Sequence, residues 1–280
     1  MLLHCGKFHL DLSRPLVMGI VNVTPDSFSD GGQHLQRDAA IAHAQQLIAE
    51  GADIIDIGGE STRPGAQPVS VQQELDRVLP IIEGLRGAPV PISIDTCKSP
   101  VMRAAIAAGV QMVNDINALQ DVEAMNAVAA ANVAVCLMHK QGNPKTMQAQ
   151  PHYQDVTGEV CEFLRDRIAA AEAAGIQLNR IVIDPGFGFG KTLVHNLTLL
   201  CGLEKLTGLG VPMLVGLSRK SMLGALTGQD VGQRMPASIA AALLAVQRGA
   251  SIVRVHDVRA TIDALKIWNA VNTENPGKSS

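Results

Sequence analysis

The chain has 280 residues, a formal net charge of −3 and 47% hydrophobic residues. This length fits two small domains or one large α/β barrel, and the hydrophobic fraction supplies a sizeable core. The near-neutral charge gives no reason to expect a nucleic-acid partner or an acidic membrane surface as a partner. The longest apolar run, Ala237–Val246, is too short to cross a bilayer.

The cysteines are scattered, without a CxxC pair or a metal-ligand spacing to histidines. They are Cys5, Cys97, Cys136, Cys161 and Cys201. We interpret them as buried free thiols of a reducing compartment. The N-terminal segment lacks the continuous apolar core of a signal peptide. We therefore expect a soluble protein of the cytoplasm.

One pattern repeats along the chain. An Ala-rich segment with helical spacing ends at a glycine, and a short apolar run, a polar residue and a loop follow. The helix-ending glycines are Gly51, Gly87, Gly109, Gly175, Gly210 and Gly249. Glycine is favoured there because it adopts the left-handed conformation without a Cβ clash. Two helix starts are also marked: Ser70 with Gln73 predicts a capping box, and Ser99 before Pro100 predicts a capped first turn.

Short apolar runs separate these helical segments. They are Leu16–Val21, Asp53–Ile57, Val90–Ile94, Gln111–Val113, Val133–Met138, Ile181–Ile183, Pro212–Leu217 and Ile252–Val255. Continuous rather than alternating runs are typical of parallel strands covered on both faces. Such units without a linker favour a closed (βα)8 TIM barrel, as one α/β domain over 1–280, over an open doubly wound sheet. We expect residues 1–14 to form an N-terminal β-hairpin that plugs the barrel floor, and residues 273–280 to fray.

Polar residues follow the predicted strands. In order they are Asn22, Glu60, Asp95, Asn114 with Asp115, His139, Asp184, Lys220, and Arg254 with His256. An isolated aspartate after a strand is often only a turn former or a helix cap. In a βα barrel, however, the loops after all strands meet at one rim, where active sites lie. The coincidence around the rim favours an enzyme.

This rim combines two chemistries. One set has two carboxylates, an amide and an ammonium, which suit a flat heterocycle with paired N–H donors and ring acceptors. Its members are Asp95, Asn114, Asp184 and Lys220. The other set is cationic with one amide oxygen, which suits a pyrophosphate bound with Mg²⁺. Its members are Arg63, Arg254, His256 and Asn22. For Arg254 the structural alternative is an ion pair with a neighbouring aspartate.

The glycine-rich segment after the sixth predicted strand matches no nucleotide-binding motif. A phosphate-binding loop needs glycine where Pro185 stands, and a dinucleotide fingerprint needs glycine where Lys191 stands. We interpret the segment as a flexible loop whose Phe189 is available to stack on a planar ligand.

Several segments together are similar to those of one family. They are MGIVNVTPDSFSDGG at 18–32, DIGGESTRPG at 56–65, Asp95, Asn114–Asp115, DPGFGFGK at 184–191, GLSRKS at 216–221 and RVHD at 254–257. In this order the chain resembles the dihydropteroate synthases of folate biosynthesis, which are pterin-binding TIM barrels. The resemblance implies that 4-aminobenzoate displaces pyrophosphate from 6-hydroxymethyl-7,8-dihydropterin diphosphate, giving 7,8-dihydropteroate.

The resemblance also implies roles for individual residues. Those expected to bind the pterin are Asp95, Asn114, Asp184 and Lys220, with Met138 and Gly216 in the same substrate site. Those expected to bind the diphosphate are Asn22, Arg63, Arg254 and His256, with the cofactor Mg²⁺ at Asn22. Those expected to frame the aminobenzoate are Thr62, Pro64, Phe28, Phe189 and Ser221. Catalysis is expected from Asp95, Lys220, Arg63, Arg254 and His256.

This chemistry needs no dedicated base, because an arylamine nucleophile is already neutral at neutral pH. The difficult step is departure of the diphosphate, which charged groups favour by electrostatic stabilisation. The expected partners are small-molecule substrates. A homodimer is also expected, because the family is usually dimeric and the helix Pro236–Val246 is apolar.

Three other functions would each account for part of this pattern. A pterin-binding methyltransferase with a corrinoid partner would share the pterin pocket but would not need the cationic set. A non-catalytic pterin-binding protein would show damaged diphosphate ligands. A phosphosugar aldolase would place a Schiff-base lysine within a strand, whereas Lys220 follows one.

Overall fold

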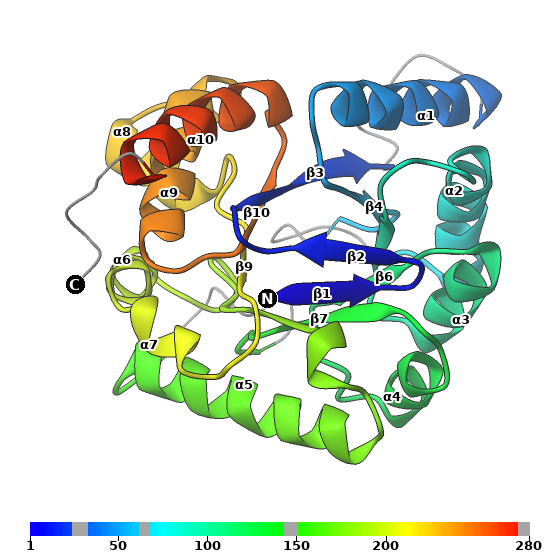
Figure 1. Ribbon diagram of the computed structural model, residues 1–280, viewed down its shortest axis with the longest axis horizontal. Helices are drawn as coiled ribbons and strands as arrows, with labels where there is room; N and C mark the ends of the chain where they lie inside the picture. The colour runs from blue at the N-terminus through cyan, green and yellow to red at the C-terminus, as the bar shows by residue number, and fades with distance from the viewer. Residues whose placement is uncertain (24–32, 62–67, 143–150, 274–280) are drawn as a thin grey trace.

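Eight parallel strands and the helices between them surround a common axis in the computed structural model of the chain, which describes residues 1–23, 33–61, 68–142 and 151–273 (Figure 1). The strands pair in the order β8-β7-β6-β5-β4-β3-β10-β9. A parallel bridge between Ile183 of β8 and Met213, next to β9, joins the two ends of this sheet. The predicted TIM barrel is therefore confirmed.

The barrel strands agree with the predicted runs. They are β3 (Leu16–Asn22), β4 (Ile54–Gly58), β5 (Ile92–Asp95), β6 (Met112–Asp115), β7 (Ala134–Met138), β8 (Ile181–Asp184), β9 (Leu214–Val215) and β10 (Ile252–Val255). Only β9 is much shorter than its run, Pro212–Leu217. Leu217 is buried like a strand residue, but its carbonyl oxygen accepts from Lys220 N at 3.3 Å in a turn in which Arg219 has φ +57°.

Helices cover the outside of the barrel. They are α1 (Gln33–Ala49), α2 (Val71–Gly84), α3 (Ser99–Ala108), α4 (Val122–Ala129), α5 (Val156–Ala173), α6 (Leu193–Cys201), α7 (Glu204–Thr207), α8 (Ser221–Thr227), α9 (Met235–Gln247) and α10 (Val258–Thr273), with short 3-10 turns η2 (Leu178–Arg180) and η3 (Val231–Gln233). The glycines predicted to end helices all have φ between +76° and +105°. Of the tail predicted to fray, only Thr273 belongs to the described residues.

The two predicted helix caps have different outcomes. The capping box of α2 is confirmed: the Ser70 hydroxyl accepts from Gln73 N at 3.2 Å, and Gln73 Oε1 accepts from Ser70 N at 2.9 Å. The cap of α3 is wrong by one residue, because Lys98 is the N-cap and makes no side-chain cap bond. Pro100 has no N–H to satisfy, so this helix start loses little without a cap.

The N-terminal hairpin closes the floor of the barrel, as predicted. β1 (Leu2–Cys5) and β2 (Phe8–Asp11) pair in antiparallel register, and Figure 1 shows them lying across the end of the barrel. Leu3 and Cys5 are fully buried. They share a core cluster with residues from the beginnings of the barrel strands, among them Met18 and Met112.

The cysteines all lie in the described part and are free thiols, as expected. Cys5 and Cys136 are buried, but Cys97 and Cys161 are only partly buried and Cys201 is exposed, so the expectation of burial is wrong for these three. Cys201 ends α6, where the chain reaches the surface. No helix within the described ranges combines the length and the apolar character that a membrane crossing requires.

The floor plug makes a testable contribution to stability. Leu3→Ala should lower the free energy of unfolding by about 2–5 kcal/mol, because it opens a cavity among fully buried side chains. Leu2→Ala is the matched control, since Leu2 is 49% exposed on the same strand. Urea unfolding followed by circular dichroism measures both. Equal losses for the two variants would show that the hairpin does not seal the core.

Candidate active site at the barrel rim

The guanidinium group of Arg254 lies between two carboxylates at the end of β10. Its Nε donates to Asp56 Oδ2 at 2.6 Å, and its Nη2 donates to Asp95 Oδ2 at 2.7 Å. Asn114 Nδ2 donates to the same Asp56 oxygen at 3.0 Å. One polar network thus joins β4, β5, β6 and β10. The ion pair named as the structural alternative for Arg254 is therefore present, in addition to its place at the rim.

Asp56 is a functional candidate that sequence reasoning missed. It lies in the middle of β4, is completely buried and receives the bonds from Arg254 and Asn114. Its other oxygen, Oδ1, has no hydrogen-bond partner among the described residues. A signal was present, because an aspartate inside the apolar run Ile54–Ile57 must find a partner once it is buried.

A second group forms where β8 and β9 end. Asp184 Oδ1 accepts from Gly186 N at 2.7 Å. Lys220 Nζ donates to the carbonyl oxygen of Phe187, and it lies 4.6 Å from the centre of the Phe189 ring. The structure therefore brings Asp184, Lys220 and Phe189 together, three of the predicted site residues.

Burial sets the charge balance of the rim. It raises the pKa of Asp95 to about 7; the neighbouring Asp56 adds to this rise, while Arg254 opposes it. Burial likewise raises the pKa of Asp184, against the attraction of Lys220. It lowers the pKa of Lys220 to about 8, against the attraction of Asp184. Three carboxylates here face two cations, so the rim favours a ligand that donates N–H bonds.

His256 is positioned by the segment that follows β9. Its Nδ1 lies 2.9 Å from the Ser218 hydroxyl oxygen, which also accepts from His256 N at 3.2 Å. The next residues are joined as well, since Arg219 donates to both Asp257 oxygens at 2.6 and 3.1 Å. These bonds fix the end of β10 to the segment that carries Lys220.

The remaining described candidates lie around these groups. Gly216 approaches Arg254, whose Cβ would be 3.8 Å from a Cβ added at Gly216. Met138 is the buried last residue of β7, and its Cγ would lie 3.4 Å from a Cβ added at Gly186. Ser221 is the first residue of α8, next to Lys220.

Asp115 has a structural role instead. Its carboxylate accepts from Asn117 N and Leu119 N, each at 2.8 Å. Ala118 and Leu119 both have φ +51°, and Arg167 donates to their two carbonyl oxygens at 2.8 and 2.7 Å. Asp115 therefore holds the strained turn that follows β6.

Asn22, the last residue of β3, lies close to Asp95. A Cβ added at Gly58 would lie 3.7 Å from Asn22 Oδ1 and 3.6 Å from Asp95 Cβ, so both side chains flank the same point. No cluster of three or more His, Cys, Asp or Glu side chains suited to a metal occurs in the described part. A single amide oxygen nevertheless fits Mg²⁺, which usually keeps waters and takes further oxygens from a substrate phosphate.

Four predicted site residues, Phe28, Thr62, Arg63 and Pro64, lie outside the described residues.

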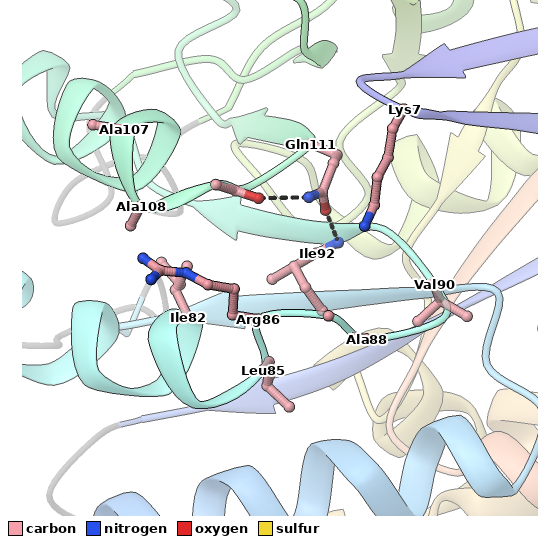
Figure 2. Close-up of a pocket in the computed structure, with 12 residues that line it drawn as sticks. Lys7, Ile82, Leu85, Arg86, Ala88, Val90, Ile92, Ala107, Ala108 and Gln111 are labelled. Carbon is pink, nitrogen blue, oxygen red and sulfur yellow. Dashed lines mark hydrogen bonds between the residues drawn. The ribbon is translucent and has the colours of Figure 1, made fainter.

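A cavity of about 360 Å³ lies at the other end of the barrel, beside the floor hairpin (Figure 2). Gln111 bridges its wall, donating to Gly109 O at 2.5 Å and accepting from Ile92 N at 2.8 Å. Lys7 and Arg86 line it next to the C-terminal ends of α2 and α3, where positive charge is favourable. This cavity is separate from the rim, and its charges have a structural explanation.

The Arg254 network predicts a large, pH-dependent loss of stability. Arg254→Met should lower the free energy of unfolding by about 3–5 kcal/mol at pH 7, because it leaves Asp56 and Asp95 buried without a cation. Burial raises the pKa of Asp95, and without Arg254 it should rise further. When folding raises the pKa of a carboxyl group, the protein loses stability as pH increases from the group's pKa in the unfolded chain toward its pKa in the folded protein. The difference in free energy of unfolding between Arg254→Met and the wild type should therefore be smaller at pH 5 than at pH 7.

Arg14→Met is the matched control for this variant. Arg14 also contacts both oxygens of an aspartate, Asp53, at 2.5 and 3.1 Å, but its side chain is 52% exposed. Its loss should be at most about 1 kcal/mol. Urea titrations at pH 5 and pH 7 test both variants, and an Arg254 deficit no larger than that of Arg14 would contradict the prediction.

Comparison with known proteins agrees with this arrangement. The family model described as pterin binding enzyme matches residues 18–256. The dihydropteroate synthase of Neisseria meningitidis serogroup C is 54% identical over 271 residues, which cover 95% of this chain and 96% of the relative.

Solved structures are similar over almost their whole length. The dihydropteroate synthase of Xanthomonas albilineans with 4-aminobenzoic acid has a TM-score of 0.91 and 55% identity, covering 97% of this chain and 98% of its own. The structure from the same organism in complex with 7,8-dihydropteroate has a TM-score of 0.89 and 52% identity, covering 97% and 99%. The chain therefore belongs to the pterin-binding enzyme family and, within it, to the dihydropteroate synthases, which are transferases.

Proposed function

We propose that the chain joins 6-hydroxymethyl-7,8-dihydropterin diphosphate to 4-aminobenzoate, giving 7,8-dihydropteroate and pyrophosphate. The observation that carries this proposal is the arrangement of Arg254 between Asp56 and Asp95, with Asn114 on the same network. It offers carboxylate acceptors and an anion-binding cation within one rim. The ligands named for the Xanthomonas structures are the arylamine and the product of this reaction.

The acidic side of the rim is proposed to bind the pterin. The 2-amino group and the ring N–H groups of a dihydropterin are donors, and buried carboxylates are the strongest acceptors for them. Asp95 and Asp184 supply such oxygens, and Asp56 Oδ1 has no partner in the described part. Lys220 supplies the donor for ring acceptors, and Phe189 supplies a face for stacking.

The cationic side is proposed to bind the diphosphate. Among the described residues, Arg254 and His256 are the proposed donors, and Arg63 is proposed to join them. Mg²⁺ is proposed as the cofactor, held by Asn22 Oδ1 together with diphosphate oxygens and water. When bound, it would supply positive charge that neutralises the leaving group.

The proposed reaction is a displacement at the pterin methylene carbon. The lone pair of the arylamine nitrogen forms the new C–N bond, the C–O bond to the diphosphate breaks, and the proton lost by the nitrogen passes to water. Arg254 and His256 stabilise negative charge on the departing oxygen, while Asp56 and Asp95 stabilise positive charge on the pterin side. Rigid barrel strands hold these groups in place before the substrates bind, which is what makes such stabilisation effective.

A homodimer is also proposed, with α9 in the interface. Large exposed apolar side chains gather on the elements from α8 to α10, which group on one side of the barrel in Figure 1. They are Leu226, Val231, Met235, Leu244, Ile267 and Val271. Pro236, Ala240 and Leu244 follow one another at helical spacing on the outer face of α9. An apolar stripe that is self-complementary suits a second copy of the chain.

A cytoplasmic location is proposed because the free thiols include the exposed Cys201. Exposed thiols persist in reducing compartments and are oxidised or paired elsewhere.

Pyrophosphate release tests the proposed reaction. The protein is mixed with the pterin diphosphate, 4-aminobenzoate and Mg²⁺, and pyrophosphate and 7,8-dihydropteroate are measured together. Both should form in equal amounts, chelation of the metal should stop the reaction, and a sulfonamide should compete with the arylamine. A folded sample that forms neither product would refute the proposal.

Lys220→Met should reduce kcat/KM for the pterin diphosphate by roughly 10²–10³-fold, the usual effect of removing one charged stabiliser. The methionine keeps the apolar stem and removes only the ammonium group. Lys205→Met is the control, because Lys205 is an exposed lysine on the short helix α7. Steady-state kinetics with varied pterin diphosphate measure the effect, and equal values for the two variants would remove the role proposed for Lys220.

Leu244→Asp should convert the dimer into a monomer, since it would bury an unpaired charge in the interface. Val194→Asp is the control, because Val194 is also exposed and apolar but lies on α6. Light scattering after size-exclusion chromatography gives the mass of each variant. A wild-type monomer, or a Leu244→Asp dimer at the same concentration, would contradict the proposed interface.

A further inference from the structure

A buried ammonium group lies beneath the loop that carries the pterin-side residues. Lys191 is 3% exposed, and its Nζ contacts three acceptors. These are Nδ1 of His139 at 2.9 Å, the carbonyl oxygen of Gly186 at 2.9 Å and that of Phe189 at 3.2 Å. An ammonium group has three N–H donors, so these contacts use all of them. The reaction proposed above assigns Lys191 no role.

His139 is a fixed acceptor for this ammonium group. Burial, assisted by the charge of Lys191, lowers the pKa of His139 to about 3. The ring is therefore neutral near pH 7, with Nδ1 as the acceptor and the proton on Nε2. Phe163 packs edge-on against the ring at 5.0 Å between centres, which holds it in place.

The loop above Lys191 has a backbone that only glycine can follow. Gly186 and Gly190 have φ +69° and +62°. A Cβ at either position would collide with a backbone carbonyl oxygen, that of His139 or that of Gln141. Tyr153 donates to the Gly190 carbonyl at 2.9 Å, and Lys191 holds the carbonyls of Gly186 and Phe189. The loop conformation thus depends on donors beneath it.

The same loop holds the groups that face the pterin. Gly186 N donates to Asp184, the Phe187 carbonyl accepts from Lys220 Nζ, and the Phe189 ring lies against that ammonium group. We propose that Lys191 is a positioning residue of the pterin site: its ammonium group fixes the 186–190 loop and, through it, Asp184, Lys220 and the Phe189 ring. This inference rests on the function proposed above.

The charge of Lys191 makes this positioning sensitive to pH. Burial lowers its pKa to about 7; Asp184 opposes the change and Lys220 adds to it. The other groups that face it are the neutral His139 ring and the Tyr153 ring, 6.0 Å from Nζ. A neutral amine has two N–H donors instead of three, so one of the three contacts loses its donor when Lys191 loses its proton, and the loop is held less firmly. Pterin binding should therefore weaken above neutral pH, before Lys220 itself titrates near 8.

Lys191→Met tests the proposal. It removes the donors and keeps the stem, and it should raise KM for the pterin diphosphate about tenfold or more while changing kcat less. Arg180→Met is the matched control. Arg180 is also buried, and among the described residues it donates to backbone carbonyls, those of Val128, Ala131 and Val133, at the floor end of the barrel. Arg180→Met should have a lower free energy of unfolding than the wild type but the same KM for the pterin diphosphate.

The pH profile of kcat/KM separates positioning from a general structural role. In the wild type the value should begin to fall near pH 7. In Lys191→Met this first fall should be absent, and the value should fall only as Lys220 titrates near pH 8. A purely structural role would lower the value at every pH and leave the midpoint unchanged.

Two results would overturn the proposal: an unchanged KM and pH midpoint in Lys191→Met, or the same changes in Arg180→Met. If Lys191→Met does not fold, Lys191→Gln replaces it, and a wild-type profile that stays flat through pH 7 is sufficient to overturn the proposal. Failure of the proposed function is a separate outcome, seen as absent pyrophosphate release by the wild type. Calorimetric titration with 7,8-dihydropteroate then still compares pterin binding among the variants.

Discussion

The structure depends on one buried interaction, the contact of Arg254 with Asp56 and Asp95 across the top of the barrel. Three charged side chains from β4, β5 and β10 lie where water is largely excluded, and none could stay charged there alone. Their mutual contacts hold the strand ends at fixed distances. They also leave Asp56 Oδ1 without a partner in the described part, so an acceptor remains for a ligand.

This network joins what the sequence treats as two separate sides. The sequence pattern predicts that Arg254 binds the diphosphate and Asp95 the pterin, yet the two side chains are hydrogen-bonded to each other. In the proposed reaction, negative charge develops on the departing diphosphate while positive charge develops on the pterin. A bonded pair at this position allows negative charge on the diphosphate and positive charge on the pterin to be stabilised together, and neither side chain needs to move far.

The support for this network lies deeper in the fold. The loop after β8 is held from below by Lys191, and the segment after β9 is held by the contacts of Ser218 with His256 and of Arg219 with Asp257. Sequence reasoning named candidate ligand-binding residues but not these supporting contacts. A donor to a backbone carbonyl leaves no pattern in a sequence, because any carbonyl accepts it. Asp56 could have been found, since its position within an apolar run is unusual.

The sequence by itself determined the barrel, its strand ends and the floor hairpin. Apolar runs, helix-ending glycines and the capping box of α2 act over a few residues, so local order is enough to predict them. The pairing of Arg254 with Asp56 and Asp95, the three contacts of Lys191 and the true length of β9 were decided only by the tertiary structure. Arg254 is 198 positions from Asp56 and 159 positions from Asp95 in the sequence. Which of the available charged side chains come into contact depends on how the barrel closes.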